Sequence, residues 1–177
     1  MPTIRQLRVY PDPILHEVSE PATEEDSDLI YDMFATMQAA DGIGLSAVQV
    51  GVLKRIIVLQ DTQSGSLYAM YNPVIIEKSG EFTHQEGCLS VPGVYEERKR
   101  YEEIRVQCDD LREGGEPYVI KSTGLDAFCI QHEIDHLDGK VFIDDYSQLK
   151  VNRARDKIKK TLKTFRKEGL TSIAYRE

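Results

Sequence analysis

The sequence predicts an α+β fold in which short, mostly antiparallel strands surround a central helix, with one further helix towards each end of the chain. Apolar residues recur at helical spacing in three separate segments, whereas strand-like runs are bunched together instead of alternating with helices. The chain has 177 residues and no repeat, linker or low-complexity stretch, which indicates a single domain spanning residues 1–177.

The first helix is expected after an extended, proline-containing N-terminal segment. Thr23, followed three residues later by Asp26, is typical of a helix cap, and the two glutamates between them suit the positive end of a helix dipole. We therefore predict that this helix begins at Thr23 and ends before Gly42. Its apolar positions follow helical spacing: Leu29, Ile30, Met33, Phe34 and Met37.

Four short runs of residues with β propensity predict strands in the middle of the chain. They cover residues 55–59, 68–71, 103–108 and 118–121. Pairs of turn-forming residues separate them, among them Asn72 with Pro73 and Gly114 with Gly115.

The second and third helices follow these strands. Thr123, with Asp126 three residues on, predicts the start of a central helix that carries the motif His-Glu-Ile-Asp-His, and Gly139 predicts its end. A third helix is expected from Gln148 to about Arg166, a basic C-terminal helix over residues 148–166.

Composition disfavours several classes of protein. No apolar run approaches the ~20 residues of a membrane-spanning helix, and the N-terminus lacks the apolar core of a signal peptide, so we expect a cytoplasmic protein without membrane contact. A net charge of −8 disfavours DNA or anionic lipid as a partner of the whole surface. Three cysteines at no disulfide-framework spacing are expected to be thiols: Cys88, Cys108 and Cys129.

The basic helix departs from this acidic average. Residues 150–167 contain nine Lys and Arg residues and one acid, a local charge of +8, so the rest of the chain carries −16. A narrow apolar stripe is expected to pack on the domain: Val151, Ala154, Ile158, Leu162 and Phe165. The remaining faces are either a solvated surface or a site for a polyanionic partner.

His132 and His136 are the strongest chemical signal in the sequence. Residues four apart on a helix lie on one face, one turn apart, so both imidazoles reach the same ion. The other residues of this face are apolar: Leu125, Phe128 and Cys129. The histidines should therefore point into the protein. Core histidines satisfied by hydrogen bonds are the weaker interpretation for a pair with Glu133 beside it.

A hydrolytic metal site needs a third protein ligand and an open position for water. Thiolates bind iron and zinc well. Cys129 precedes His136 by ~10.5 Å of helix rise, too far for a short side chain, and Cys108 lies in a predicted strand, so both are expected to be core thiols. Cys88, in a loop beside Gly87, is the ligand that we choose.

Glu133 follows the first histidine directly, so its side chain leaves the helix beside the ligand face. This position suits a carboxylate that touches the water on the metal without taking a coordination site. It accepts the water proton and later delivers it to a leaving amine. The residues themselves therefore predict a metal-dependent hydrolase.

Three separated blocks resemble the peptide deformylases. They are residues 42–49 (GIGLSAVQ), 86–90 (EGCLS) and 131–139 (QHEIDHLDG). Their order and spacing fit that family, and weaker similarity extends from Tyr10 to about Lys163. The resemblance implies removal of the N-formyl group from the formylmethionine of nascent polypeptides, with release of formate. It assigns the metal to Cys88, His132 and His136, with ferrous iron expected natively and zinc, nickel or cobalt as alternatives.

The resemblance also implies roles around the ion. Glu133 carries the proton, and the side-chain amide of Gln49 with the backbone N–H of Leu89 stabilises the oxyanion. A pocket for the methionine side chain is implied, lined by Ile43, Gly44, Leu125, Phe128 and Cys129. Ser46 and Val48 stand where alanine and often proline are usual, which leaves every chemical group in place. Glu86 and Arg100 either brace the Cys88 loop as a pair or are separately solvated.

Other functions make different predictions. A metallopeptidase would use Glu or His as third ligand and cleave internal bonds, and an RNA-binding module with a structural metal would need a fourth ligand. A noncatalytic relative conflicts with the complete set of reactive residues. The resemblance further implies that the basic C-terminal helix contacts the ribosome. Deletion after about Asp145 is then expected to spare turnover of short peptides and to abolish ribosome binding.

Overall fold

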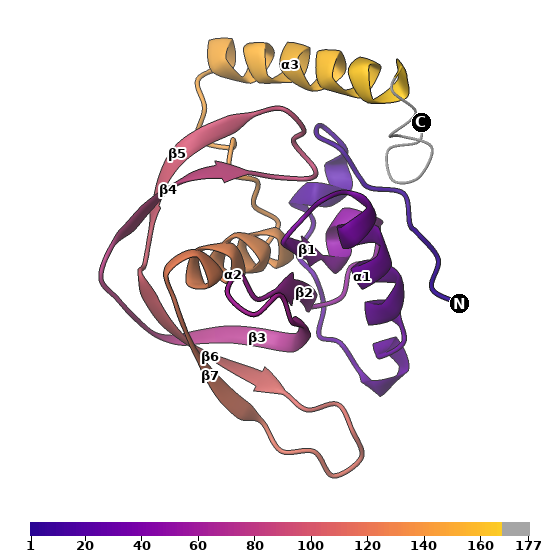
Figure 1. Cartoon of the computed structure of the whole chain (residues 1–177), viewed down its shortest axis with the longest axis vertical. Helices are drawn as coiled ribbons and strands as arrows, with labels where there is room; N and C mark the ends of the chain where they lie inside the picture. Colours follow the sequence, from indigo (N-terminus) through magenta and orange to yellow (C-terminus); the bar gives the residue numbers. More distant parts are fainter. Residues whose placement is uncertain (168–177) are drawn as a thin grey trace.

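The computed structural model describes residues 1–167. The fold is α+β, as the sequence predicts (Figure 1). The α-helices are α1 (Leu29–Ala39), α2 (Gly124–Leu137) and α3 (Gln148–Lys167). The strands are β1 (Gly44–Ser46), β2 (Ile56–Gln60), β3 (Leu67–Ser79), β4 (Phe82–Gly87), β5 (Tyr95–Arg100), β6 (Glu103–Asp109) and β7 (Tyr118–Thr123). Short 3₁₀ helices are η1 (Pro13–His16), η2 (Glu24–Asp26) and η3 (Ala47–Val50).

Helix α2 lies in the middle of the molecule, between a five-stranded sheet and a two-stranded hairpin (Figure 1). The sheet is antiparallel throughout, in the order β1-β2-β3-β6-β7, and β4 pairs with β5. Apolar side chains of the sheet pack on α2 in one core cluster, which includes Ile57, Leu59, Met70, Ile104, Val106, Ala127, Ile130, Ile134 and Leu137. The helix that carries the histidines is thus anchored along its length.

Strand β2 explains why its sequence is a continuous apolar run. Successive side chains of a strand point to opposite faces. Ile57 and Leu59 face α2, whereas Ile56 and Val58 join a second cluster with Met33 of α1 and its neighbours. Both faces of β2 are therefore covered by helices, which removes the need for alternating polar residues.

Helix α3 covers a third cluster, at the opposite end of the molecule from the β6–β7 hairpin (Figure 1). Ala154 and Ile158 are buried there against Val91 and Val94, in the loop between β4 and β5. The predicted bounds of this helix are confirmed, and Ala154 and Ile158 of its predicted apolar stripe are buried. Within residues 1–167, no helix combines the length and the apolarity needed to cross a lipid bilayer.

The predicted start of the first helix is wrong. The Thr23–Asp26 capping box exists, with the Thr23 N–H donating to Asp26 at 2.8 Å, but it closes the short turn η2. Helix α1 begins only at Leu29. Thr123 occupies the N-cap position of α2 without a side-chain capping bond, and Gly139 follows the end of the helix at φ +72°. Asp126 makes no capping bond, however, because its carboxylate accepts the Thr62 N–H at 3.0 Å.

The strand predictions miss three features, of which the short strand β1 is one. Strand β3 continues through Asn72 and Pro73, with an irregular register there instead of a turn. Asn72 accepts the Ala22 N–H at 2.7 Å and donates to Asp109 at 2.8 Å, so partners distant in sequence hold its positive φ of 51°. The β4–β5 hairpin was not predicted, because its mainly polar sequences lack the apolar alternation of a typical strand.

Candidate functional site

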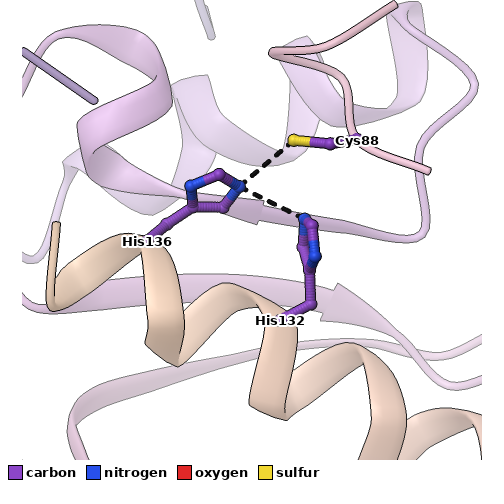
Figure 2. Close-up of side chains that lie close together, drawn as sticks. All are labelled: Cys88, His132 and His136. Atoms are coloured by element: carbon purple, nitrogen blue, oxygen red, sulfur yellow. Dashed lines mark hydrogen bonds between the residues drawn. The ribbon is translucent and has the colours of Figure 1, made fainter. Parts of the chain in front are cut away.

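Helix α2 brings both histidines of its motif to one buried face. His132 is 6% exposed and His136 is fully buried. Figure 2 shows the two imidazoles projecting from consecutive turns of the helix toward Cys88, which lies in the loop after β4. The i, i+4 spacing therefore aligns the side chains as the sequence predicts.

The three side chains converge on one point. The His136 Nε2 atom lies 3.1 Å from Cys88 Sγ and 3.2 Å from His132 Nε2. All three ligand atoms lie within 4.8 Å of one another. Ligands bound to one ion at ~2.0–2.3 Å stand roughly 3–4 Å apart, so the trio fits a single metal. Within residues 1–167 it is the one such group. Cys108 and Cys129 are buried and are not part of it.

A buried ion pair orients His132. Its Nδ1 atom lies 2.5 Å from Glu86, and Arg100 donates to both oxygens of Glu86, at 2.9 and 2.7 Å. Arg100 also donates to Asp135 at 2.8 Å. Burial opposes ionisation of Glu86, but the bonds from His132 and Arg100 outweigh it and lower its pKa to about 2. The bond to Nδ1 leaves Nε2 for the metal, and the Glu86–Arg100 pair is confirmed.

Glu133 is buried next to these ligands, with 3% of its surface exposed. Gly44 of β1 approaches it so closely that an added Cβ would lie 2.6 Å from Glu133 Oε1. Among the described residues, Glu133 Oε2 has no hydrogen-bond partner. Burial is the main cause that raises the pKa of Glu133 to about 7. A carboxyl group that titrates near neutrality is suited to exchanging protons with a bound molecule.

Gln49 has a defined amide orientation. Its Oε1 atom accepts the Ser46 N–H at 2.8 Å and the Ser46 hydroxyl at 2.9 Å. Its Nε2 atom donates to Ser90 Oγ at 3.2 Å and contacts Cys88 Sγ at 3.5 Å. The amide hydrogens therefore face the metal-ligand loop. Ser46, in the place where the resemblance leads one to expect alanine, holds the oxygen on the other side.

A groove of about 450 Å³ opens beside this cluster. The five residues predicted for a methionine pocket all line it: Ile43, Gly44, Leu125, Phe128 and Cys129. Cys88, His132, Glu133 and Leu89 line it as well. Its size lies in the range of pockets that bind small molecules and peptide ends.

The chain matches the family model described as Polypeptide deformylase over residues 4–152. The chain belongs to the peptide deformylase family. It is 47% identical to the peptide deformylase of Neisseria meningitidis serogroup C over 158 residues, 87% of this chain and 93% of that protein. It is 46% identical to that of Alkalilimnicola ehrlichii over 165 residues, covering 90% and 92% of the two chains.

Solved structures agree. A crystal structure of a peptide deformylase from Legionella pneumophila is similar with a TM-score of 0.82 and 40% identity, over 92% of this chain and 97% of that one. This chain is a metal-dependent hydrolase that removes the N-formyl group from nascent polypeptides. The group that could hold a metal contains a cysteine, whereas the rival metallopeptidase would be expected to have Glu or His as third ligand.

Sequence reasoning did not assign several residues that line the groove, among them His84, Tyr95 and Phe165. His84 shares a face of β4 with Glu86 and lies edge-on to the Phe128 ring at 5.7 Å. Its period-two spacing from Glu86 was a usable signal once β4 was recognised as a strand. Phe165 was assigned to the packing stripe of α3, and its place in the groove was not foreseen.

Proposed function

We propose that Glu133 is the proton carrier of the deformylation reaction, with Cys88, His132 and His136 as the metal ligands. The observation that carries this assignment is the buried Glu133 carboxyl, which lies beside the ligand trio and lines the groove. Its Oε2 atom has no partner among residues 1–167. A buried carboxylate oxygen normally finds a hydrogen-bond partner, so a water or substrate group is expected at this position.

A divalent metal held by Cys88, His132 and His136 would supply Lewis acidity and lower the pKa of a water molecule. Glu133 accepts a proton from the attacking water and then delivers it to the nitrogen of methionine as formate leaves. We assign the oxyanion to two donors, the Nε2 amide of Gln49 and the backbone N–H of Leu89. The orientation of Gln49, fixed from behind by Ser46, supports the first of these roles.

The methionine side chain of the substrate is proposed to lie against Ile43, Leu125, Phe128 and Cys129. Gly44 borders the same space and admits the substrate backbone because it carries no side chain. Ferrous iron is proposed as the native ion, by resemblance, with zinc, nickel or cobalt also suited to one thiolate and two imidazoles. Residues 1–177 are proposed to form a single catalytic domain that works in the cytoplasm, where nascent chains emerge.

A comparison of three substrates tests the proposed role of the groove in formyl recognition. The parent protein, purified anaerobically and loaded with iron, should release formate from formyl-Met peptides far faster than it releases acetate from acetyl-Met peptides. The acetyl methyl group would occupy space next to the attacked carbon. Internal peptide bonds should stay intact. Comparable rates on all three substrates would refute the role of this groove in formyl recognition.

We further propose that α3 contacts the ribosome. All nine Lys and Arg residues of this helix are exposed, and clustered cations neutralise phosphates with release of counterions, which makes binding sensitive to salt. Some of this charge has partners within the chain, because Lys150 pairs with Glu96 at 2.8 Å and Arg155 lies over the Tyr10 ring. Lys157 and Lys160, two exposed cations in the middle of the helix, are the candidates that we choose for the contact.

Point variants test this contact better than truncation. Deleting the chain after Asp145 would remove Ala154 and Ile158, which are buried against the Cys88 loop, so lost turnover would be ambiguous. A variant with Lys157 and Lys160 changed to glutamate should lose cosedimentation with ribosomes at low salt and keep turnover on short formyl peptides. Lys121→Glu, on β7 at the other end of the molecule, is the matched control. If this variant bound ribosomes as well as the parent does, the basic residues of α3 would only form a solvated surface.

A further inference from the structure

The C-terminal half of α3 packs against the loop that follows Cys88. Gly93 lies in this loop at φ +79°, and an added Cβ there would stand 2.1 Å from Thr161 Oγ1 of α3. No other residue type would permit so close an approach. Ile158 and Ala154, one and two turns earlier, are buried against Val91 and Val94 of the same loop. The position of this helix relative to the groove is therefore set by packing.

Phe165 follows Thr161 by four residues and so lies on the same face of α3. Its half-buried side chain lines the groove that also holds Cys88, His132 and Glu133. Pro92 and Gly93, in the loop before β5, line the same groove. The family match ends at residue 152, so this contribution lies outside the segment that identifies the protein.

The groove has lining residues beyond those proposed to hold formylmethionine. The proposed reacting groups and methionine walls come from β1 and its neighbours, from α2 and from the start of the loop after β4. The later part of that loop, from Pro92 to Val94, and Phe165 form a further stretch of wall that these roles do not use. A nascent polypeptide continues beyond its first residue and has to leave the groove, so its second and third residues need a surface to pass along.

We propose that Phe165 is a substrate-binding residue for the peptide chain after formylmethionine, and that it favours apolar or aromatic side chains there. This inference rests on the proposed placement of formylmethionine in the same groove. An aromatic ring at the wall of a groove offers dispersion contacts and stacking geometries to apolar groups, and little to small polar ones. Phe165, near the C-terminal end of the basic helix, thereby contributes to substrate specificity.

Three tripeptides test the proposal by formate release under steady-state conditions: formyl-Met-Ser-Ser, formyl-Met-Phe-Ser and formyl-Met-Ser-Phe. The parent enzyme should prefer at least one phenylalanine peptide over the serine peptide by about five- to tenfold in kcat/KM, mainly through KM. Phe165→Ala should abolish that preference, because kcat/KM should fall more for the phenylalanine peptides than for formyl-Met-Ser-Ser. Thr164→Ala, an exposed neighbour on the same helix, should behave like the parent.

Each failure has a distinct meaning. If Phe165→Ala lost the same factor in kcat/KM on all three peptides, Phe165 would only anchor the helix. If the preference were unchanged, Phe165 would not touch the substrate. Either result overturns the proposal. If the alanine variant unfolds, Phe165→Leu keeps the packing and should still reduce the preference by about half or more. Absence of formate release from formyl-Met-Ser-Ser by the parent would instead refute the proposed function of the groove.

Discussion

Replacing Gly44 by alanine tests whether the position of the Glu133 carboxyl controls turnover. The new Cβ would lie 2.6 Å from Glu133 Oε1 and 2.6 Å from Cys129 Sγ. Real Cβ contacts below 3.0 Å are essentially never seen, and ordinary contact begins at 3.4 Å. Gly44 has no left-handed φ, so the substitution adds overlap without backbone strain. The flexible carboxyl end of Glu133 is the neighbour best able to give way.

The size of the effect follows from this overlap. Relieving it moves the carboxyl by about 0.4–0.8 Å, and misplacement of a catalytic group by ~1 Å costs on the order of 10²-fold. We expect kcat/KM for a formyl-Met peptide to fall about ten- to hundredfold, equivalent to roughly 1.4–2.7 kcal/mol in activation free energy. Metal content per chain should not change, because the three atoms nearest to the alanine methyl belong to Cys129 and Glu133 and not to the proposed metal ligands.

The assay is formate release with purified, metal-loaded Gly44→Ala, together with metal analysis and thermal unfolding. Cys129→Ala alone and combined with Gly44→Ala serves as a control, because removing Sγ gives β1 room to shift. The combined loss should be smaller than the product of the two single losses, as expected for residues in contact. Parent-like kcat/KM in fully metallated Gly44→Ala would refute the claim that this carboxyl position is critical.

Four further predictions follow from the site. Glu133→Ala should keep one metal per chain but lose at least about 10²–10⁴-fold in kcat; near-normal formate release would contradict its role. Cys88→Ser should weaken metal binding, whereas Cys129→Ser should retain the ion; elemental analysis decides, and the reverse result would disprove the ligand assignment. Ser46→Ala removes one of two bonds to Gln49 Oε1 and should lower kcat about three- to tenfold at constant KM; an unchanged kcat argues against positioning. In the metal-free protein, Glu133 has a folded pKa of about 7 against a reference of 4.5. The unfolded chain loses this proton first, so stability should fall as pH rises between these values. The free energy of unfolding of metal-free Glu133→Gln, measured with urea across this pH range, should not show this fall.

The helices and the histidine pair could be predicted because the signals for them are local. A period of 3.6 residues placed α2 and α3 correctly, and the i, i+4 spacing alone put His132 and His136 on one face. Helix rise was enough to separate Cys129 from the ligand group, which the observed trio bears out. These conclusions depend on distances along a single element, and backbone geometry determines such distances.

Elements stabilised from elsewhere could not be predicted in this way. Thr23 and Asp26 form the expected bonds, but a capping box does not determine whether an α-helix or a single turn follows. Asn72 and Pro73 are typical of a turn, yet bonds from Ala22 and to Asp109 keep them within β3. The sequence of β4 and β5 is polar because one face of the hairpin lies toward solvent.

The residue types and their spacing along the chain were enough to predict the kind of chemistry: two imidazoles one helical turn apart, a carboxyl beside them, and a thiol in a separate block. Contacts between groups far apart in the chain depend on the tertiary fold. Cys88 reaches His136 across 48 residues, and Glu86 reaches His132 across 46. Phe165 of α3 lines a groove whose proposed reacting residues lie on α2 or earlier in the chain. Periodicity describes the order within one helix or strand, whereas such contacts depend on how several elements pack on a shared core.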